Sequence, residues 1–384
     1  MGKPQFSKSF LLNLGLGTLL ALATVVITLI YTGQEHNLHW WIDWYNRTLD
    51  VVEAWENSPE AAWQIIADSL VSDRNRLYTI PLVPFLLIWG KSRAVYQIAL
   101  ALTYLFPFSL VMGSLAAQLV PRWKNRYFWL AALITLLTPV NWMSTFLGIP
   151  DTGAAAFMGI ATLLYLQVIE ISAKIPPFFL AQRRVSAGAR GDHSRFKLLS
   201  IKLRESSLNK ETILGLWQFI CQQIVVIFPY WRVPVIGVAI AMAIMIRRHF
   251  AYGGIALLGA IAILAAIDFA LLIKKNIAKN WQLAFWNLIV HSLQLFVIVD
   301  TCLFTLKKVV PEFTNQAMAT NYRNLYTSWS LPFLTISQHY LELLGIIPWL
   351  LVGIGFAVSY SDPKWFERDA PGGCVSFKLF LGLP

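Results

Sequence analysis

The sequence predicts an all-α integral membrane protein, a polytopic helix bundle of about eight spans with surface helices in its first external loop. Hydrophobic residues make up 57% of the 384 residues and charged residues only 13%, whereas soluble domains carry about 25% charged residues. The basic residues gather in segments between apolar runs, as expected of cytoplasmic loops. The net charge of +11 therefore predicts an orientation in the membrane and gives no reason to expect nucleic-acid binding.

The first apolar run, residues 10–31, is predicted to be a retained membrane span. It is longer and more uniformly apolar than the core of a cleavable signal peptide. Lys3 and Lys8 precede it, so we expect a cytoplasmic N-terminus and an external residue 32.

Residues 32–93 are predicted to form an external loop that lies on the membrane surface. From Gln34 to Arg76 there are eight acidic residues against three arginines, together with five tryptophans. Indole rings favour the lipid headgroup region, and scarce lysine and arginine indicates the non-cytoplasmic side. We therefore expect two short amphipathic helices here, one starting near Asp50 and one that Ser58 caps with Pro59 at its first position.

The end of this loop, residues 77–89, is apolar but shorter than the roughly 20 residues that a span requires. Pro81 and Pro84 interrupt it, so we expect a re-entrant or interfacial segment. This interpretation also places the following basic cluster, from Arg122 to Arg126, in the cytoplasm.

Residues 94–173 are predicted to hold three spans, and residues 174–211 a basic cytoplasmic loop. In residues 212–360 two clear apolar runs predict spans at 250–273 and 283–306, and a weaker one predicts a last span at 341–360. Glutamines and prolines interrupt residues 212–246, which are either one kinked span or a hairpin. We expect residues 1–384 to form a single transmembrane domain, ending in a tail at 361–384 without a clear role.

Two external carboxylates are the candidate catalytic residues. Asp43 follows the first span by about a dozen residues, and Asp151 stands in a Pro-Asp-Thr-Gly turn that opens a span. Such a pair can deprotonate an acceptor or bind a metal ion that neutralises a phosphate. The simpler alternatives are a solvated loop residue for Asp43 and a helix N-cap for Asp151.

Arg247, Arg248 and His249 follow an apolar run and have two interpretations. If one kinked span precedes them, they face outward and can hold a lipid phosphate. If a hairpin precedes them, they are cytoplasmic anchors, and the inward bias of positive charge favours this second interpretation.

Asp268, His291 and Asp300 fall inside predicted spans. Ionisable residues there usually face a partner or a polar cavity. They support a different class of function, a transporter or flippase of a lipid-linked or anionic substrate.

The arrangement resembles the GT-C superfamily of membrane glycosyltransferases, in particular its protein mannosyltransferase and aminoarabinose transferase group. An aspartate lies in the first external loop (Trp41-Ile-Asp43-Trp), followed by surface helices and by an apolar stretch that ends in Gly90-Lys-Ser-Arg93. A second external turn, Pro150-Asp151-Thr-Gly, opens a later span. The sequence departs from the aminoarabinose type before Pro81, where Thr79 and Ile80 replace an acidic-basic pair.

The resemblance implies transfer of a sugar from a polyprenyl-phosphate donor to a lipid, glycan or protein acceptor at the external or periplasmic face of a bacterial inner membrane. It implies a catalytic centre at Asp43 with Asp151 nearby, without a cofactor or, alternatively, with a divalent metal ion on Asp151. Because the phosphate contacts before Pro81 are absent, external basic and tyrosine residues are the candidate donor phosphate ligands: Arg74, Arg76, Lys91, Arg93, Arg247, Arg248, Tyr322 and Arg323. A truncated, inactive copy of such an enzyme is a further alternative, since the family typically has more spans.

Overall fold

The computed structural model describes residues 8–33, 40–70, 75–120, 124–174, 231–275 and 277–310, with scattered residues between 332 and 350. All regular structure in these residues is helical. The basic segment 175–211, most of the predicted last span and the tail lie outside them.

Five helical segments are long and apolar enough to cross a membrane, so the chain is a multi-pass membrane protein. They lie in α1 (Lys8–Thr32), the continuous α5–η2–α6 (Arg93–Leu119), α9 (Asp151–Lys174), α14 (Phe250–Lys275) and α15 (Ile277–Val309). A sixth is added if α7 (Lys124–Leu137) and α8 (Pro139–Phe146), bent by 54° at their junction, count as one span.

The predicted number of about eight spans is not reached in the described residues. In the disputed segment 212–246 the structure describes one apolar helix, α13 (Arg232–Ile246), which is only 15 residues long. Residues 77–89 form the 3₁₀ turn η1 (Leu77–Thr79) and the seven-residue helix α4 (Val83–Trp89), which is too short to cross a bilayer.

The first loop forms two helices, α2 (Trp40–Asn57) and α3 (Pro59–Ser69). The start of α3 follows the prediction, because Ser58 accepts a hydrogen bond from the amide of Ala61 at 3.1 Å and Pro59 occupies the first turn. α2 begins about ten residues earlier than predicted. Asp43 therefore stands in the first turn of a helix.

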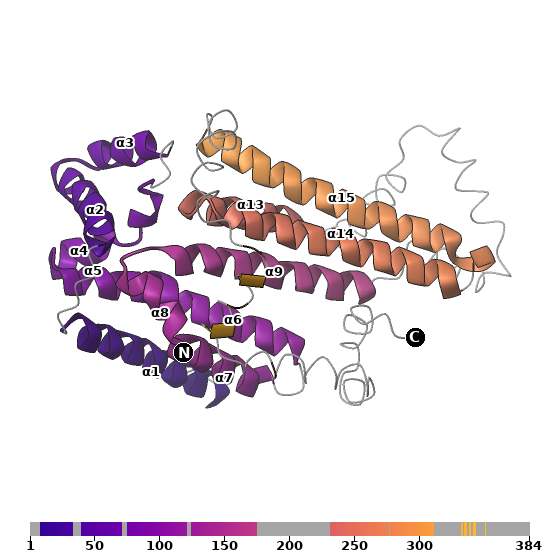
Figure 1. The fold of residues 1–384 in the computed structure, drawn as a ribbon, viewed down its shortest axis with the longest axis horizontal. Coiled ribbons are helices and arrows are strands. Elements are labelled where there is room, and N and C mark those ends of the chain that lie inside the picture. The colour runs from indigo at the N-terminus through magenta and orange to yellow at the C-terminus, as the bar shows by residue number, and fades with distance from the viewer. Residues whose placement is uncertain are drawn as a thin grey trace, which may run out of the picture.

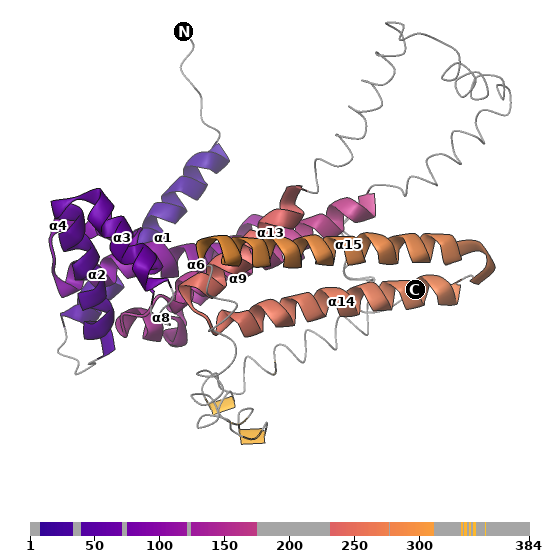
Figure 2. The same cartoon turned by 90° about the horizontal axis from the view of Figure 1, so that it is seen from above.

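The helices divide into a small group at one end and a long bundle (Figure 1). α2, α3 and α4 gather at the end where α9 and α14 begin, while α9, α13, α14 and α15 run along the long axis (Figures 1 and 2). Asn75 ties this group to the bundle, since its side-chain amide donates to the carbonyl of Met245 at 2.5 Å.

Glycines allow the long helices to approach closely, as is usual for helices in membranes. A Cβ at Gly113 of α6 would lie 2.6 Å from the carbonyl oxygen of Phe128 in α7. A Cβ at Gly159 of α9 would lie 2.5 Å from Val111 of α6, and one at Gly237 of α13 would lie 3.0 Å from the amide of Cys302 in α15. These contacts bring α6 against α7 and α9, and α13 against α15.

Candidate functional site

Three segments that are far apart in sequence meet at the end of the bundle where the first-loop helices lie. They are the start of α2, the start of α9, and the turn at residues 247–249 between α13 and α14. A buried cluster joins them, because Trp44 of α2, Ala154 of α9 and Ile246 of α13 belong to the same hydrophobic core.

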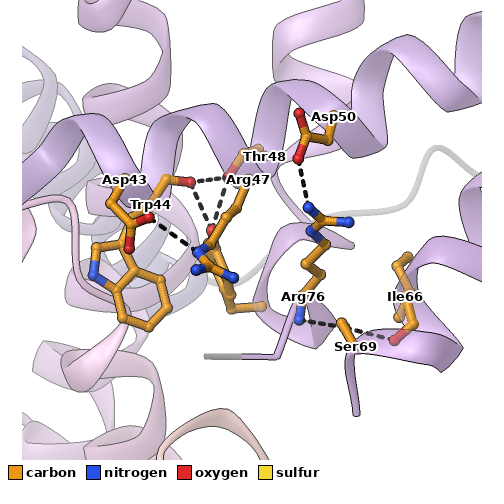
Figure 3. Close-up of polar contacts among 9 residues, drawn as sticks. Asp43, Trp44, Arg47, Thr48, Asp50, Ile66, Ser69 and Arg76 are labelled. Atoms are coloured by element: carbon orange, nitrogen blue, oxygen red, sulfur yellow. Dashed lines mark hydrogen bonds and ion pairs between the residues drawn. The ribbon is translucent and has the colours of Figure 1, made fainter. Parts of the chain in front are cut away.

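Asp43 and Trp44 come from the first turns of α2. The Asp43 carboxylate pairs with Arg47 one turn later, with 3.3 Å between Oδ1 and Nε, and the Asp43 side chain is 43% exposed (Figure 3). Trp44 is buried, with 3% of its surface exposed. The helical spacing thus holds a solvent-accessible carboxylate beside a buried indole ring.

Tyr78 fixes the position of Trp44. Its hydroxyl donates to the Trp44 carbonyl at 2.6 Å, and its ring meets the indole edge-on at 5.1 Å between centroids. Thr48 donates to the same hydroxyl at 3.2 Å. Because burial raises the pKa of Tyr78 well above its ordinary value, this hydroxyl stays protonated and remains a donor.

Asp151 is positioned by the turn Gly148-Ile-Pro-Asp-Thr-Gly. Gly148 has a φ of +72°, a conformation that favours glycine, and its carbonyl accepts the Tyr96 hydroxyl at 2.8 Å. The amides of Gly153 and Ala154 donate to the Pro150 carbonyl at 3.0 and 3.3 Å. The Asp151 carboxylate is therefore not needed as the cap of these amides, in contrast to the simpler sequence interpretation.

A glycine is required at position 153 because the ring of Tyr104 lies directly against its Cα. An added Cβ would come within 2.8 Å of Cε1 of Tyr104. Tyr104 belongs to η2 (Ala101–Leu105), a π-helical turn inside the second span, and its hydroxyl donates to the Tyr78 carbonyl at 2.5 Å. One tyrosine thus connects the Asp151 turn to the segment that holds Trp44.

Arg247 connects the three segments directly. Its Nε lies 2.5 Å from Oδ1 of Asp151, and its guanidinium carbon lies 5.2 Å from the ring centre of Trp44. The second contact is a cation–π geometry. An arginine from the α13–α14 turn is thus held between a carboxylate of α9 and an aromatic ring of α2.

His249 stands two residues further along the same turn. Burial lowers its pKa, the Asp151 carboxylate opposes that effect, and the Arg247 guanidinium lowers the pKa further. The net result is a pKa below the ordinary value of 6.5, so the imidazole is neutral at pH 7.

The structure places Arg247, Arg248 and His249 at the end of the bundle where the first loop lies, so their interpretation as cytoplasmic anchors holds only if that loop is itself cytoplasmic. Arg247 contacts Asp151 and Trp44, so the turn lies at the same end of the bundle as the first loop. The positive-inside rule is a statistical bias of short loops, and the packing of this turn places Arg247 in an ion pair with Asp151. Sequence reasoning had no means of seeing this partner, which lies 96 residues earlier.

Two of the other predicted phosphate ligands, Arg76 and Lys91, pair with acids further along α2. Arg76 pairs with Asp50 at 2.5 Å (Figure 3), and Lys91 pairs with Glu56 at 2.7 Å. At 1.5 Å per residue these partners lie roughly 10 and 20 Å further along α2 than Asp43. Arg93 begins α5. Arg74, Tyr322 and Arg323 lie outside the described residues.

In the described ranges no group of three histidine, cysteine, aspartate or glutamate residues is arranged to hold a metal ion. Asp151 pairs with an arginine instead. Of the residues that suggested a transporter, Asp300 is exposed on α15 and His291 is partly buried nine residues earlier on the same helix.

Sequence reasoning did not identify the roles of Trp44, Tyr78 and Tyr104. Each contacts a partner at least 26 residues away in sequence, and no local pattern signals such contacts. Comparison with known proteins adds no assignment, because no protein-family model, curated protein or solved structure matches the chain significantly.

Proposed function

We propose that the chain is a membrane glycosyltransferase that moves a sugar from a polyprenyl-phosphate donor to a lipid, glycan or protein acceptor. One observation carries the proposal. The half-exposed Asp43 and the Asp151–Arg247 pair flank the buried ring of Trp44, at the end of the bundle covered by the first-loop helices. A base for an acceptor and a cation for a leaving phosphate are the two groups that this transfer needs.

In the proposed reaction an acceptor hydroxyl attacks the anomeric carbon of the sugar while the bond from that carbon to the phosphate oxygen breaks. The configuration at this carbon inverts. Asp43 accepts the hydroxyl proton, and the polyprenyl phosphate leaves with one more negative charge than it had in the donor. Arg247 stabilises that developing charge, because a guanidinium matches the geometry of phosphate oxygens.

The site is proposed to face the outside of a bacterial inner membrane. Lys124 and Arg126 at the start of α7, and Lys275 at the end of α14, lie at the end of the bundle opposite to Asp151. On the positive-inside rule we propose that this end of the bundle, and with it the N-terminus, is cytoplasmic.

The transporter alternative has less support from the described residues. His291 and Asp300 are nine residues apart on one helix, which separates them by about 14 Å along the axis. The exposed Asp300 faces away from the bundle core and not into a shared polar centre.

Sugar transfer in isolated membranes tests the proposal. Wild type and the Asp43→Asn variant would be compared at matched expression, with a series of radiolabelled polyprenyl-phosphate sugars. We expect product from the wild type with at least one donor, and a rate about 10²- to 10⁴-fold lower for Asp43→Asn, the usual contribution of a general base. Asp68→Asn, which changes an exposed acid of α3, serves as the control and should retain the wild-type rate.

Loss of transfer in Asp43→Asn alone would support the assignment. Equal rates in all three proteins would contradict the site. An absence of product from wild type with every donor would contradict the proposed activity itself.

A further inference from the structure

The Asp151–Arg247 pair differs from the other ion pairs at this end of the molecule. Arg47–Asp43, Arg76–Asp50 and Lys91–Glu56 each include an aligned hydrogen bond. Nε of Arg247 and Oδ1 of Asp151 are shielded from solvent and 2.5 Å apart, yet neither atom makes a hydrogen bond. Buried charged atoms are normally hydrogen-bonded, whereas these two atoms form an ion pair without an aligned hydrogen bond.

The surroundings of Arg247 suit an incoming anion. Trp44 covers the guanidinium at 5.2 Å and excludes water from that side, while 20% of the Arg247 side chain remains exposed to solvent. We therefore expect a ligand to reach Arg247 from its exposed side, with Trp44 left in place. A phosphate ester offers two oxygens to the guanidinium fork and makes bidentate hydrogen bonds, which the Asp151 contact lacks.

We propose that the phosphate of the lipid-linked donor binds Arg247 by displacing Asp151, and that the displaced carboxylate then becomes available to the acceptor. This inference rests on the proposed glycosyltransferase function and specifies how the donor is held. In the empty site Asp151 neutralises Arg247. In the occupied site the phosphate takes that place, and the carboxylate of Asp151 is released from its ion pair only when a donor is present.

The inference makes Asp151 a competitor of the donor. Removing its charge should therefore strengthen phosphate binding while it impairs transfer, whereas removing Arg247 should weaken binding. An energetic coupling of the usual size changes an affinity by about 5- to 150-fold. We expect the dissociation constant of Asp151→Asn to fall by an amount in this range.

Equilibrium binding of radiolabelled geranylgeranyl phosphate to the full-length protein in detergent micelles tests the inference, with geranylgeraniol as the uncharged reference. The variants are Asp151→Asn, Arg247→Gln and the double variant, with Arg247→Lys included in case Arg247→Gln does not fold. Asp50→Asn is the matched control, because it releases Arg76 in the same way that Asp151→Asn releases Arg247.

Tighter binding in Asp151→Asn, weaker binding in Arg247→Gln and no tightening in the double variant would support the inference. Unchanged or weaker binding in Asp151→Asn would overturn it. Equal tightening in Asp50→Asn would overturn it as well, since the effect would then be general electrostatics or would belong to Arg76.

Inorganic phosphate, as a second probe, separates this inference from the proposed function. If Asp151→Asn tightens inorganic phosphate binding but no protein prefers the lipid phosphate over the alcohol, Arg247 is a phosphate site and the lipid-linked donor is wrong. If neither probe binds to any variant, the phosphate site at Arg247 and the lipid-linked donor are both wrong.

Discussion

Asp43 and Asp151 show how far single residues can be interpreted from sequence. Their positions relative to apolar runs indicated which end of the bundle they share, since both follow from counting spans. The ion-pair partners of the two carboxylates could not be inferred in this way. Arg47 lies one helical turn from Asp43, so identifying it as the partner requires the correct start of α2. Arg247, the partner of Asp151, lies in a turn that is distant in sequence. Partners within a turn depend on helix boundaries, and distant partners depend on packing that no local pattern encodes.

At the same scale, His249 predicts a pH dependence of stability. Its pKa in the folded protein lies below the ordinary value of 6.5 that the unfolded chain retains. At a pH between the folded and the unfolded pKa, the unfolded chain therefore binds more protons than the folded one. Stability therefore falls as the pH drops below about 6.5. We expect the apparent Tm of wild type, followed by tryptophan fluorescence in detergent, to drop more between pH 7.5 and 5.5 than that of His249→Gln. An equal drop in both proteins would show that His249 does not contribute.

At the scale of elements, the sequence predicted the long apolar helices and the Ser58 cap well, because both depend on local composition. It placed the start of α2 too late, since the polar and aromatic residues 40–49 lack the clear apolar stripe of a membrane span. α2 is stabilised instead by contacts of Trp44 and Thr48 with Tyr78. Such tertiary contacts decide helix boundaries that propensity leaves open.

The glycine contacts give a prediction at this scale. Gly153→Ala should destabilise the protein by about 1–3 kcal/mol, because the added methyl group meets the ring of Tyr104. Transfer activity should fall with it, since the same turn positions Asp151. Gly259→Ala is the matched control, because nothing lies within 4 Å of the added Cβ, and a helical alanine should if anything raise stability. Thermal unfolding of the two variants in detergent measures the difference, and equal Tm values would contradict the packing at Gly153.

At the scale of the whole molecule, counting apolar runs and basic clusters gave the fold class and the alternation of helices. It did not reveal that the α13–α14 turn lies beside the start of α9, where Arg247 pairs with Asp151. The corrected arrangement predicts that Asn57 of α2 and Arg248 share one side of the membrane and that Asn125 of α7 lies on the other.

Cysteine labelling tests this topology in a background where Cys221, Cys302 and Cys374 are replaced by serine. In intact cells, a membrane-impermeant maleimide should modify Asn57→Cys and Arg248→Cys, and should reach Asn125→Cys only after permeabilisation. Labelling of Arg248→Cys together with Asn125→Cys would restore the interpretation of the turn as a cytoplasmic anchor.

The central claim of this account is that α2, the start of α9 and the α13–α14 turn form one site, and chemical cross-linking tests it most directly. In the same cysteine-free background, Asp151→Cys and Arg247→Cys would be combined, with a protease site inserted in the segment 174–211 between them. A short bis-maleimide should hold the two fragments together after cleavage. In the control protein with Asn125→Cys and Arg247→Cys, the two fragments should separate. Separation of the 151–247 pair, with both cysteines accessible to a single maleimide, would contradict the site.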